Sequence, residues 1–421
     1  MAARTLSSLA TKSACLVATA AGAAALAGCP LYPAEGEQGV PTQSNTQTHT
    51  TTSVTTTTSS QGGGGAGGEG AGGGGGGGGG APASCLDPTL AADVFAIAEP
   101  GLCLVGKYTA PFEVSYALSP SWGRHGGPLT VQAGSPAGSV DLGRWSTPVE
   151  QVGELTAQTT NVPLAIQAPG SVFIGPTAVD LPFANWTLVS WTGDFGSSDG
   201  EALLLSGSSV AQRQPVAGLF SAVGVPSESV LGRILHTSLT KLGAAADPQK
   251  AGLYAADICA NLQPCATEEV AIWGDANGPV KLDQDGNAFA VETTLSPAQL
   301  TLRAFAAASV APGAGPTSGV ELFTLDGFGS ELAVLAPVAG APGLVFFQPF
   351  DALAYDALDV VVERFIVSGG LVGAVGAPTP ALTLATPGTP LTLMTDSAGR
   401  LWVAAVTAPG ESTFYVLARS S

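Results

Sequence analysis

A run of glycine that is almost unbroken from Gly62 to Gly80 limits what this chain can fold into. The surrounding stretch has almost no large apolar residue after Tyr32, and it contains a Thr- and Ser-rich tract from Thr46 to Ser60. Such a segment has no apolar surface whose burial could offset the entropy lost on ordering. Residues 29–84 are therefore predicted to be a disordered tether, and residues 85–421 are predicted to hold the folded domain.

The N-terminal residues have the pattern of an export signal. Arg4 and Lys12 supply positive charge, and an apolar stretch of small residues follows from Ala14 to Leu26. This stretch is too short and too closely flanked by small residues for a membrane-spanning helix, so residues 1–28 are predicted to be a signal peptide. An ordinary secretory signal and a lipoprotein signal are the two alternatives.

The end of this signal, Leu26-Ala27-Gly28-Cys29, resembles the lipobox of bacterial lipoproteins. The resemblance implies cleavage before Cys29, attachment of fatty acids such as palmitate to that residue, and the membrane as a partner, because several acyl chains give stable anchoring. No Asp or Glu occurs in the five residues that begin at Cys29. In this family an acidic residue there retains the protein in the inner membrane, so the outer membrane is expected, facing the periplasm or the cell surface.

The folded part is acidic and poor in charge. Residues 85–421 contain 12 Lys and Arg against 29 Asp and Glu, which gives a net charge of −17. Affinity for nucleic acid comes from clustered Lys and Arg, so nucleic acid is excluded as a partner. An acidic surface suits solubility and the association of cations.

Four cysteines lie in the folded part, and their number is even. In an exported protein this predicts disulfides, with Cys85 paired to Cys103 and Cys259 paired to Cys265 by proximity in sequence. A zinc site is the alternative. It is disfavoured because no His lies near either pair and neither spacing is C-x₂-C.

Short β-branched or aromatic runs bounded by Gly, Pro, Ser or Asp dominate the folded part and predict an all-β fold. Helical periodicity occurs only weakly, in 88–98 and in 227–242. The clearest strand-like runs are Pro128–Gln132, Ser171–Ile174, Trp186–Ser190, Ala202–Leu205 and Phe414–Leu417.

Three segments share the frame Asp-x-x-Gly-x-x-apolar, beginning at Asp283, Asp326 and Asp396. An Asp that bonds nearby backbone and a Gly with positive φ are typical of hairpin turns, so each carboxylate is expected to bond its own turn. Further segments have the Gly of this frame but not the Asp. Together these glycines recur at intervals of about 40 residues, a period associated with propeller blades of four short strands.

The segment Asp396-Ser-Ala-Gly-Arg-Leu-Trp-Val403 is similar to the blade motif of β-propellers. The resemblance implies a single β-propeller of six to eight blades over residues 85–421. Because the glycine intervals are irregular, a β-sandwich or two stacked β-domains remain the alternatives.

Catalytic motifs are sparse, and no catalytic set is predicted. Gly196-Ser-Ser-Asp-Gly200 fits the G-x-S-x-G pattern of hydrolases, but it lies between two strand-like runs and a hairpin loop is favoured. The small-residue segment 370–376 lacks the spacing and the Lys of a phosphate-binding loop, so a strand is favoured there. His125 and His236 are the folded part's histidines, and both are expected in loops or in a satisfied interior.

Asp283, Asp285 and Asn287 place three oxygen-bearing side chains in one turn, and Ca²⁺ prefers such oxygen ligands. The EF-hand pattern is not met, because Gly286 stands at the wrong position. A solvated turn is therefore favoured over a Ca²⁺ site, and no cofactor is predicted.

Three classes of function fit this sequence. The favoured one is a membrane-anchored, non-catalytic binding or scaffolding domain, in which side chains such as Trp122, Trp145 or Trp273 contact a protein or glycan. A secreted glycan-active hydrolase or lyase with an acidic pair is the second, and it needs two carboxylates in one pocket. A structural envelope protein is the third.

Overall fold

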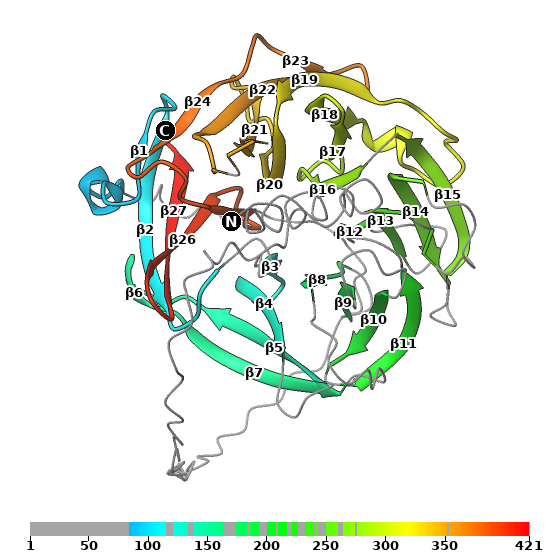
Figure 1. Cartoon of the computed structure of the whole chain (residues 1–421), viewed down its shortest axis with the longest axis horizontal. Helices are drawn as coiled ribbons and strands as arrows, with labels where there is room; N and C mark the ends of the chain where they lie inside the picture. Colours follow the sequence, from blue (N-terminus) through cyan, green and yellow to red (C-terminus); the bar gives the residue numbers. More distant parts are fainter. Residues whose placement is uncertain are drawn as a thin grey trace, which may run out of the picture. The chain divides into compact units, whose positions relative to one another are not determined.

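The structure is a computed structural model, and most of its described residues lie in β-strands and none in an α-helix. They form six sheets arranged in a ring (Figure 1). The predicted all-β, propeller-like fold is therefore confirmed. The described residues are 84–114, 121–133, 139–163, 174–182, 186–192, 200–207, 209–216, 221–225, 232–239, 241–242, 250–259, 264–273, 276–351, 353–354 and 356–420.

The first three sheets follow one another along the chain, each with four antiparallel strands in sequence order. Their strands are β3 (Ser121–Gly123), β4 (Gly127–Ala133), β5 (Ser139–Ser146) and β7 (Thr156–Pro163); β8 (Ile174–Asp180), β9 (Trp186–Thr192), β10 (Gly200–Ser206) and β11 (Ser209–Val216); and β12 (Ser221–Val225), β13 (Gly232–Ser238), β14 (Gly252–Ile258) and β15 (Pro264–Ile272).

The next three sheets complete the ring, and the last two recruit strands from the beginning of the folded part. Their strands are β16 (Ala276–Leu282), β17 (Ala288–Leu295), β18 (Ala298–Phe305) and β19 (Val320–Asp326); β20 (Phe328–Leu335), β21 (Gly343–Phe350), β22 (Val360–Ser368), β23 (Leu371–Ala374), β24 (Thr379–Leu384) and β1 (Phe95–Ile97); and β25 (Thr392–Thr395), β26 (Leu401–Ala408), β27 (Glu411–Arg419), β2 (Leu102–Ala110) and β6 (Val152–Glu154).

The ring is closed by strands from the two ends of the folded part. The innermost strands β3, β8, β12, β16, β20 and β25 contact one another in this order, and β25 contacts β3 again. Near the chain's C-terminus, β27 pairs antiparallel with β2, with Leu102 opposite Arg419. This closed arrangement rules out the alternatives of a β-sandwich and of two stacked β-domains.

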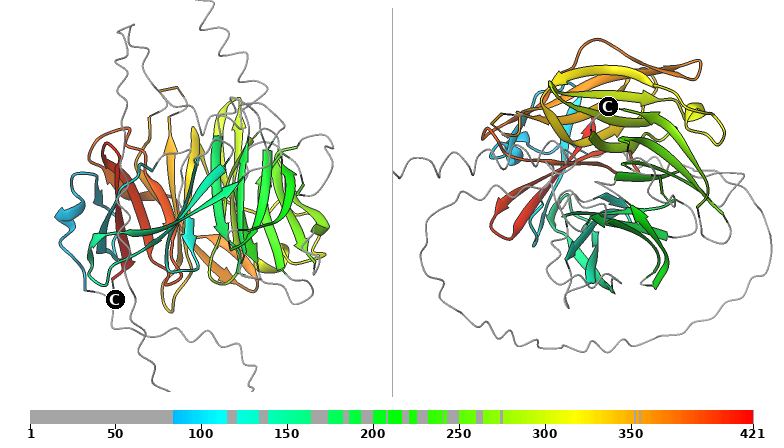
Figure 2. Two further views of the ribbon diagram at one scale, coloured as in Figure 1. Left: turned by 90° about the horizontal axis from the view of Figure 1, so that it is seen from below. Right: turned by 45° about the vertical axis from the view of Figure 1, so that its right-hand side comes forward.

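Both faces of most sheets are buried, because neighbouring sheets pack face to face (Figure 2). On β16, Val280 packs with the apolar side chains of the preceding sheet, whereas Phe289 on β17 packs toward β20 and β21. All residues of β21 are buried. Strands that are buried on both sides have near-continuous apolar sequences, which explains the short apolar runs.

Side-chain hydrogen bonds join the innermost strands to one another. Ser121 Oγ of β3 donates to the Ala178 carbonyl of β8 (2.5 Å). Ser221 Oγ of β12 accepts from the Val280 amide of β16 (3.1 Å). Glu331 of β20 is buried and accepts from the Leu393 amide of β25 (3.1 Å). Among the described strands, each innermost strand has no pairing strand on its central side. These side-chain bonds satisfy backbone groups that would otherwise lack a partner there.

The repeat period differs from the sequence prediction. The innermost strands begin at 121, 174, 221, 276, 328 and 392, so successive sheets are 47 to 64 residues apart instead of about 40. Gly127 and Gly252, two of the glycines in the weaker matches to the frame, do not hold equivalent positions, because Gly127 begins the second strand of its sheet and Gly252 the third. Neither has the positive φ of a turn glycine, so they do not mark one repeated turn.

The two weakly helical stretches are also corrected. Residues 88–98 contain a short 3₁₀ turn, Pro88–Ala91, followed by β1. The described part of 227–242 contains β13, all of whose residues are buried. Burial between two sheets overrides a weak local periodicity. No helix among the residues that the structure describes is both long and apolar enough to cross a membrane.

Candidate functional site

The Asp396 turn joins β25 to β26 and matches the sequence prediction. Asp396 Oδ1 accepts from the amides of Ala398 (3.0 Å) and Arg400 (2.8 Å). Its Oδ2 accepts from Arg400 Nε (2.6 Å) and from the indole Nε1 of buried Trp402 (2.9 Å). Gly399 has a φ of 71°, as such a turn requires. The Asp, Gly and Trp of the motif therefore form one hydrogen-bonded unit.

The Asp283 turn occupies the equivalent place between β16 and β17. Asp283 Oδ1 accepts from the amides of Asp285 (3.0 Å) and Asn287 (2.8 Å), and its Oδ2 accepts from Asn287 Nδ2 (2.8 Å). Asn287 Oδ1 accepts from the Ala307 amide (3.1 Å). Burial raises the pKa of Asp283. The oxygens of Asp283 and Asn287 thus bond the turn and its neighbour, and only Asp285 of the three candidate ligands is exposed.

Asp326 does not form such a turn, and this expectation was wrong. It ends β19 and is followed by Gly327, which leads directly into β20 of the next sheet. Asp326 is exposed, and its Oδ1 accepts from Gln299 Nε2 (3.2 Å) and not from local backbone. A connection between sheets needs no hairpin turn, so the same sequence frame has a different role here.

The two histidines have structural surroundings, as expected. His236 is fully buried, and its Nε2 accepts from the Leu242 amide (3.2 Å) while Nδ1 lies 3.0 Å from Ser238 Oγ. Burial lowers the pKa of His236 to about 3, so the imidazole is neutral. His125 Nε2 lies 3.0 Å from the carbonyl oxygen of Trp145.

The tryptophans proposed as ligand contacts lie mostly in the interior. Trp145 is buried, donates from Nε1 to Thr130 Oγ1 (3.0 Å), and packs against Phe112. Trp273 is buried between two sheets. Trp122 is partly exposed and packs on the Trp402 ring. Large aromatic side chains supply much of the buried area between sheets, so Trp145 and Trp273 cannot reach a ligand.

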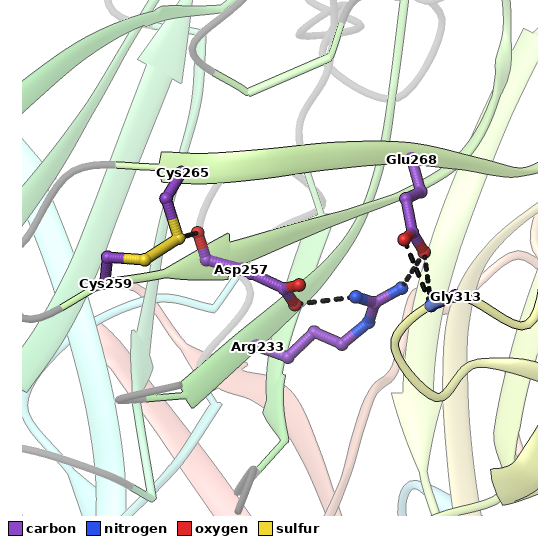
Figure 3. Close-up of polar contacts among 6 residues, drawn as sticks. All are labelled: Arg233, Asp257, Cys259, Cys265, Glu268 and Gly313. Atoms are coloured by element: carbon purple, nitrogen blue, oxygen red, sulfur yellow. Dashed lines mark hydrogen bonds and ion pairs between the residues drawn. A yellow bond between two sulfur atoms is a disulfide. The ribbon is translucent and has the colours of Figure 1, made fainter. Parts of the chain in front are cut away.

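Both predicted disulfides are present, Cys85–Cys103 and Cys259–Cys265. The first joins the residues before the 3₁₀ turn to β2, the strand that closes the ring. The second joins the end of β14 to the beginning of β15 (Figure 3). Their formation excludes the zinc alternative, because all four thiols are used. Cys29 and residues 1–83 lie outside the described residues.

Close to the second disulfide, a buried ion cluster crosses three strands (Figure 3). Arg233 of β13 is almost fully buried, and its two Nη atoms bind Asp257 Oδ1 of β14 (2.6 Å) and Glu268 Oε2 of β15 (2.5 Å). Glu268 also accepts from the Gly313 amide (3.1 Å). The hydrogen bond from Arg233 holds the pKa of Glu268 below its usual value. The cluster is structural, since all three side chains are paired.

The two remaining sequence motifs lie beside or within strands. Residues 196–199 of the G-x-S-x-G segment lie outside the described residues, but the flanking strands β9 and β10 pair antiparallel as a hairpin does. The segment 370–376 contains β23, a strand that pairs with β22, as predicted. It is an exposed edge and is not tightly packed, because Leu371 is 67% exposed.

The structure also shows a groove that sequence reasoning missed. It lies where β19 ends beside β21 and β22 of the next sheet, and it has a volume of about 520 Å³. Apolar side chains of Leu325, Pro349, Val361 and Leu384 line much of it. Small-molecule and peptide sites usually have such a volume and a mostly apolar lining with a few polar groups.

Residues 357–359 form another wall of the groove, which buried Gln348 fastens to the sheet. Gln348 Nε2 donates to the carbonyls of Leu358 (3.2 Å) and Thr389 (3.1 Å), and its Oε1 accepts from the Leu391 amide (2.8 Å). The Leu358 amide also donates to the Pro349 carbonyl (2.9 Å). This wall is therefore held in place before any ligand arrives.

Two carboxylates, those of Asp326 and Asp359, line the groove. Asp359 Oδ1 accepts from the Leu384 amide (2.8 Å), which fixes its position. Asp359 stands 33 residues from Asp326 in sequence, and its neighbours show no repeated frame. No local sequence signal therefore indicated this site.

Comparison with known proteins gives a likeness of arrangement only. No protein-family model matches the chain, and no curated protein matches it. A putative oxidoreductase (glucose dehydrogenase) from Thermus thermophilus is 13% identical, with a TM-score of 0.44 over 75% of this chain and 99% of that chain. A thermostable family-43 glycoside hydrolase is 12% identical, with a TM-score of 0.34 over 63% of this chain and 96% of that chain.

An exo-1,5-α-L-arabinanase from a bovine ruminal metagenomic library is 10% identical, with a TM-score of 0.33 over 61% of this chain and 96% of that chain. These structures include both oxidoreductases and glycosidases. Likeness of this extent bears on neither the activity nor the ligand of the chain, because one fold serves many functions.

Proposed function

We propose that this chain is an outer-membrane lipoprotein, anchored through Cys29, that displays a non-catalytic binding propeller in which each of the six sheets is one blade. The tether 29–84 would hold the propeller away from the lipid headgroups. The ligand would be a protein or a glycan, bound at the groove beside β19 and β22. A structural envelope protein would need no such groove.

The observation that supports this function best is the contrast between the groove and the other polar groups. Asp283, Asp396, Arg233 and His236 are all engaged in hydrogen bonds or ion pairs that join parts of the fold. The groove instead presents apolar side chains and two carboxylates, and one of its walls is held in place by Gln348. Exposed, rigidly supported groups of this kind are typical of binding sites.

The anchor is tested by replacing the cysteine. Cys29→Ser removes the thiol that would carry the lipid, so labelled palmitate should no longer be incorporated and the protein should leave the membrane fraction. Cys15→Ser, in the signal segment, is the matched control and should change neither property. If the wild-type chain incorporates no palmitate, the lipid anchor is wrong.

A second function is favoured by one observation, the presence of Asp326 and Asp359 in the same groove. A glycan-active hydrolase needs two carboxylates that flank one bond. Release of reducing ends from a panel of polysaccharides tests this function, with Asp326→Asn and Asp359→Asn as variants. Loss of release in both variants would establish the enzyme and overturn the non-catalytic proposal.

A further inference from the structure

The groove has a chemical character that restricts its ligand. Of the described residues that line it, all but two aspartates are apolar, and none of them is Lys, Arg or His. Asp351 and Asp356 do not line the groove but lie close in sequence to its lining residues Pro349 and Ala357, and the Asp351 amide donates to the Asp356 carbonyl (2.9 Å). Within the described part of the chain none of these four aspartates forms an ion pair. Their negative charge is therefore not neutralised locally.

The loop that follows β21 also exposes large apolar side chains. Leu353 is 93% exposed and Leu358 is 43% exposed, although both lie on a loop that is fastened at several points. Asp351 Oδ1 accepts from the amides of Leu353 (2.6 Å) and Ala354 (2.8 Å), and this lowers the pKa of Asp351 and keeps it ionised. Apolar groups held out to solvent beside a groove are typical of interaction surfaces.

Charge complementarity selects one kind of partner. A second copy of this chain is disfavoured, because its net charge of −18 would bring like charges together. Anionic ligands are disfavoured by the four aspartates for the same reason. Sugar rings usually stack on exposed aromatic faces, and none of the described residues that line the groove is aromatic.

Resting on the proposed binding function, we propose that the groove binds a cationic, amphipathic peptide segment of a partner protein. Its apolar side chains would enter between Leu325, Val361 and Leu358, and its Lys or Arg side chains would pair with Asp326 and Asp359. Apolar contact supplies affinity in such a complex, whereas the charges accelerate association and select the partner.

The test uses the full chain in detergent and two peptides, Gly-Leu-Lys-Val-Lys-Leu-Gly and Gly-Leu-Glu-Val-Glu-Leu-Gly, with binding measured by calorimetry. The lysine peptide should bind and the glutamate peptide should not. Affinity for the lysine peptide should fall between about 20 and about 500 mM NaCl, because salt screens exposed ion pairs. The double variant Asp326→Asn, Asp359→Asn should bind it about fivefold to tenfold more weakly.

Two matched controls separate the groove from general effects. Asp285→Asn removes an exposed aspartate elsewhere and should leave the affinity unchanged. Leu358→Ser should weaken binding at both salt concentrations, whereas Leu371→Ser, at the exposed edge strand β23, should not. Thermal melts of each variant verify that the fold is retained.

Equal binding of the two peptides, or an equal loss in Asp285→Asn, would overturn the proposal. Absence of binding by a folded protein would overturn this ligand class as well. The proposed function is tested separately: palmitate incorporation tests the anchor, and release of reducing ends tests the non-catalytic role. Failure of the peptide proposal is therefore distinguishable from failure of the proposed function.

Discussion

At the scale of single residues, Asp396 and Asp326 show how one sequence frame can have two energetic roles. The Asp396 carboxylate is buried and accepts four hydrogen bonds, including one from the buried indole of Trp402. Asp326 is exposed and accepts one hydrogen bond from Gln299. A buried donor that loses its acceptor keeps its full desolvation cost, whereas an exposed donor can form a hydrogen bond with water instead.

Asp396→Ala should therefore lower the free energy of unfolding by about 2–4 kcal/mol, because it leaves Trp402 Nε1 and turn amides without partners. Asp326→Ala should change it by less than about 0.5 kcal/mol. Urea unfolding of both variants beside the wild type measures the difference. Equal losses would contradict the different roles assigned to the two aspartates.

At the scale of strands and sheets, the Arg233 cluster holds β13, β14 and β15 in register. Its buried guanidinium binds the buried carboxylate of Asp257 on the adjacent strand β14 and the partly exposed carboxylate of Glu268 on β15, one strand further. Lys241 and Glu269 form an ion pair at 2.9 Å whose side chains are 34% and 39% exposed. Removal of one member of a buried pair leaves an uncompensated charge, whereas exposed pairs contribute little.

Arg233→Met should accordingly lower the free energy of unfolding by about 3–5 kcal/mol, since Asp257 would stay buried without its partner. Lys241→Met is the matched control and should cost about 0–1 kcal/mol. Adding Asp257→Leu to Arg233→Met should recover part of the loss. If both single variants unfolded at the same urea concentration, the buried cluster would contribute no more to stability than the exposed ion pair.

At the scale of the whole folded part, stability depends on how the ring is closed. The closing contact is the pairing of β2 with β27, strands that lie more than three hundred residues apart in sequence. Cys103 lies on β2, and its disulfide with Cys85 secures the residues that precede the closing strand. The Leu86 amide adds a hydrogen bond to the Leu104 carbonyl (2.6 Å).

The double variant Cys85→Ser, Cys103→Ser should lose about 3 kcal/mol of unfolding free energy, because this disulfide spans 18 residues. Cys259→Ser, Cys265→Ser, which opens a span of 6 residues, should lose about 2 kcal/mol. Guanidinium unfolding under oxidising conditions provides both values. A larger loss for the shorter span would show that native contacts, and not the unfolded chain, decide the effect.

The sequence by itself determined the features that depend on near neighbours. The all-β character, both disulfides and the turns at Asp283 and Asp396 follow from residues within about 20 positions of one another. Such contacts involve short loops, whose low closure entropy makes proximity in sequence a good guide to proximity in space.

Only the tertiary structure decided the features that depend on distant segments. Packing between sheets buried Trp145 and Trp273. Strand pairing within one sheet brought Arg233 to carboxylates on β14 and β15. Packing between sheets also placed Asp326 beside Asp359 in one groove. Each of these positions is fixed by how one sheet meets the next or by which strands pair. That arrangement depends on the sum of many apolar contacts, and no single local sequence pattern records it.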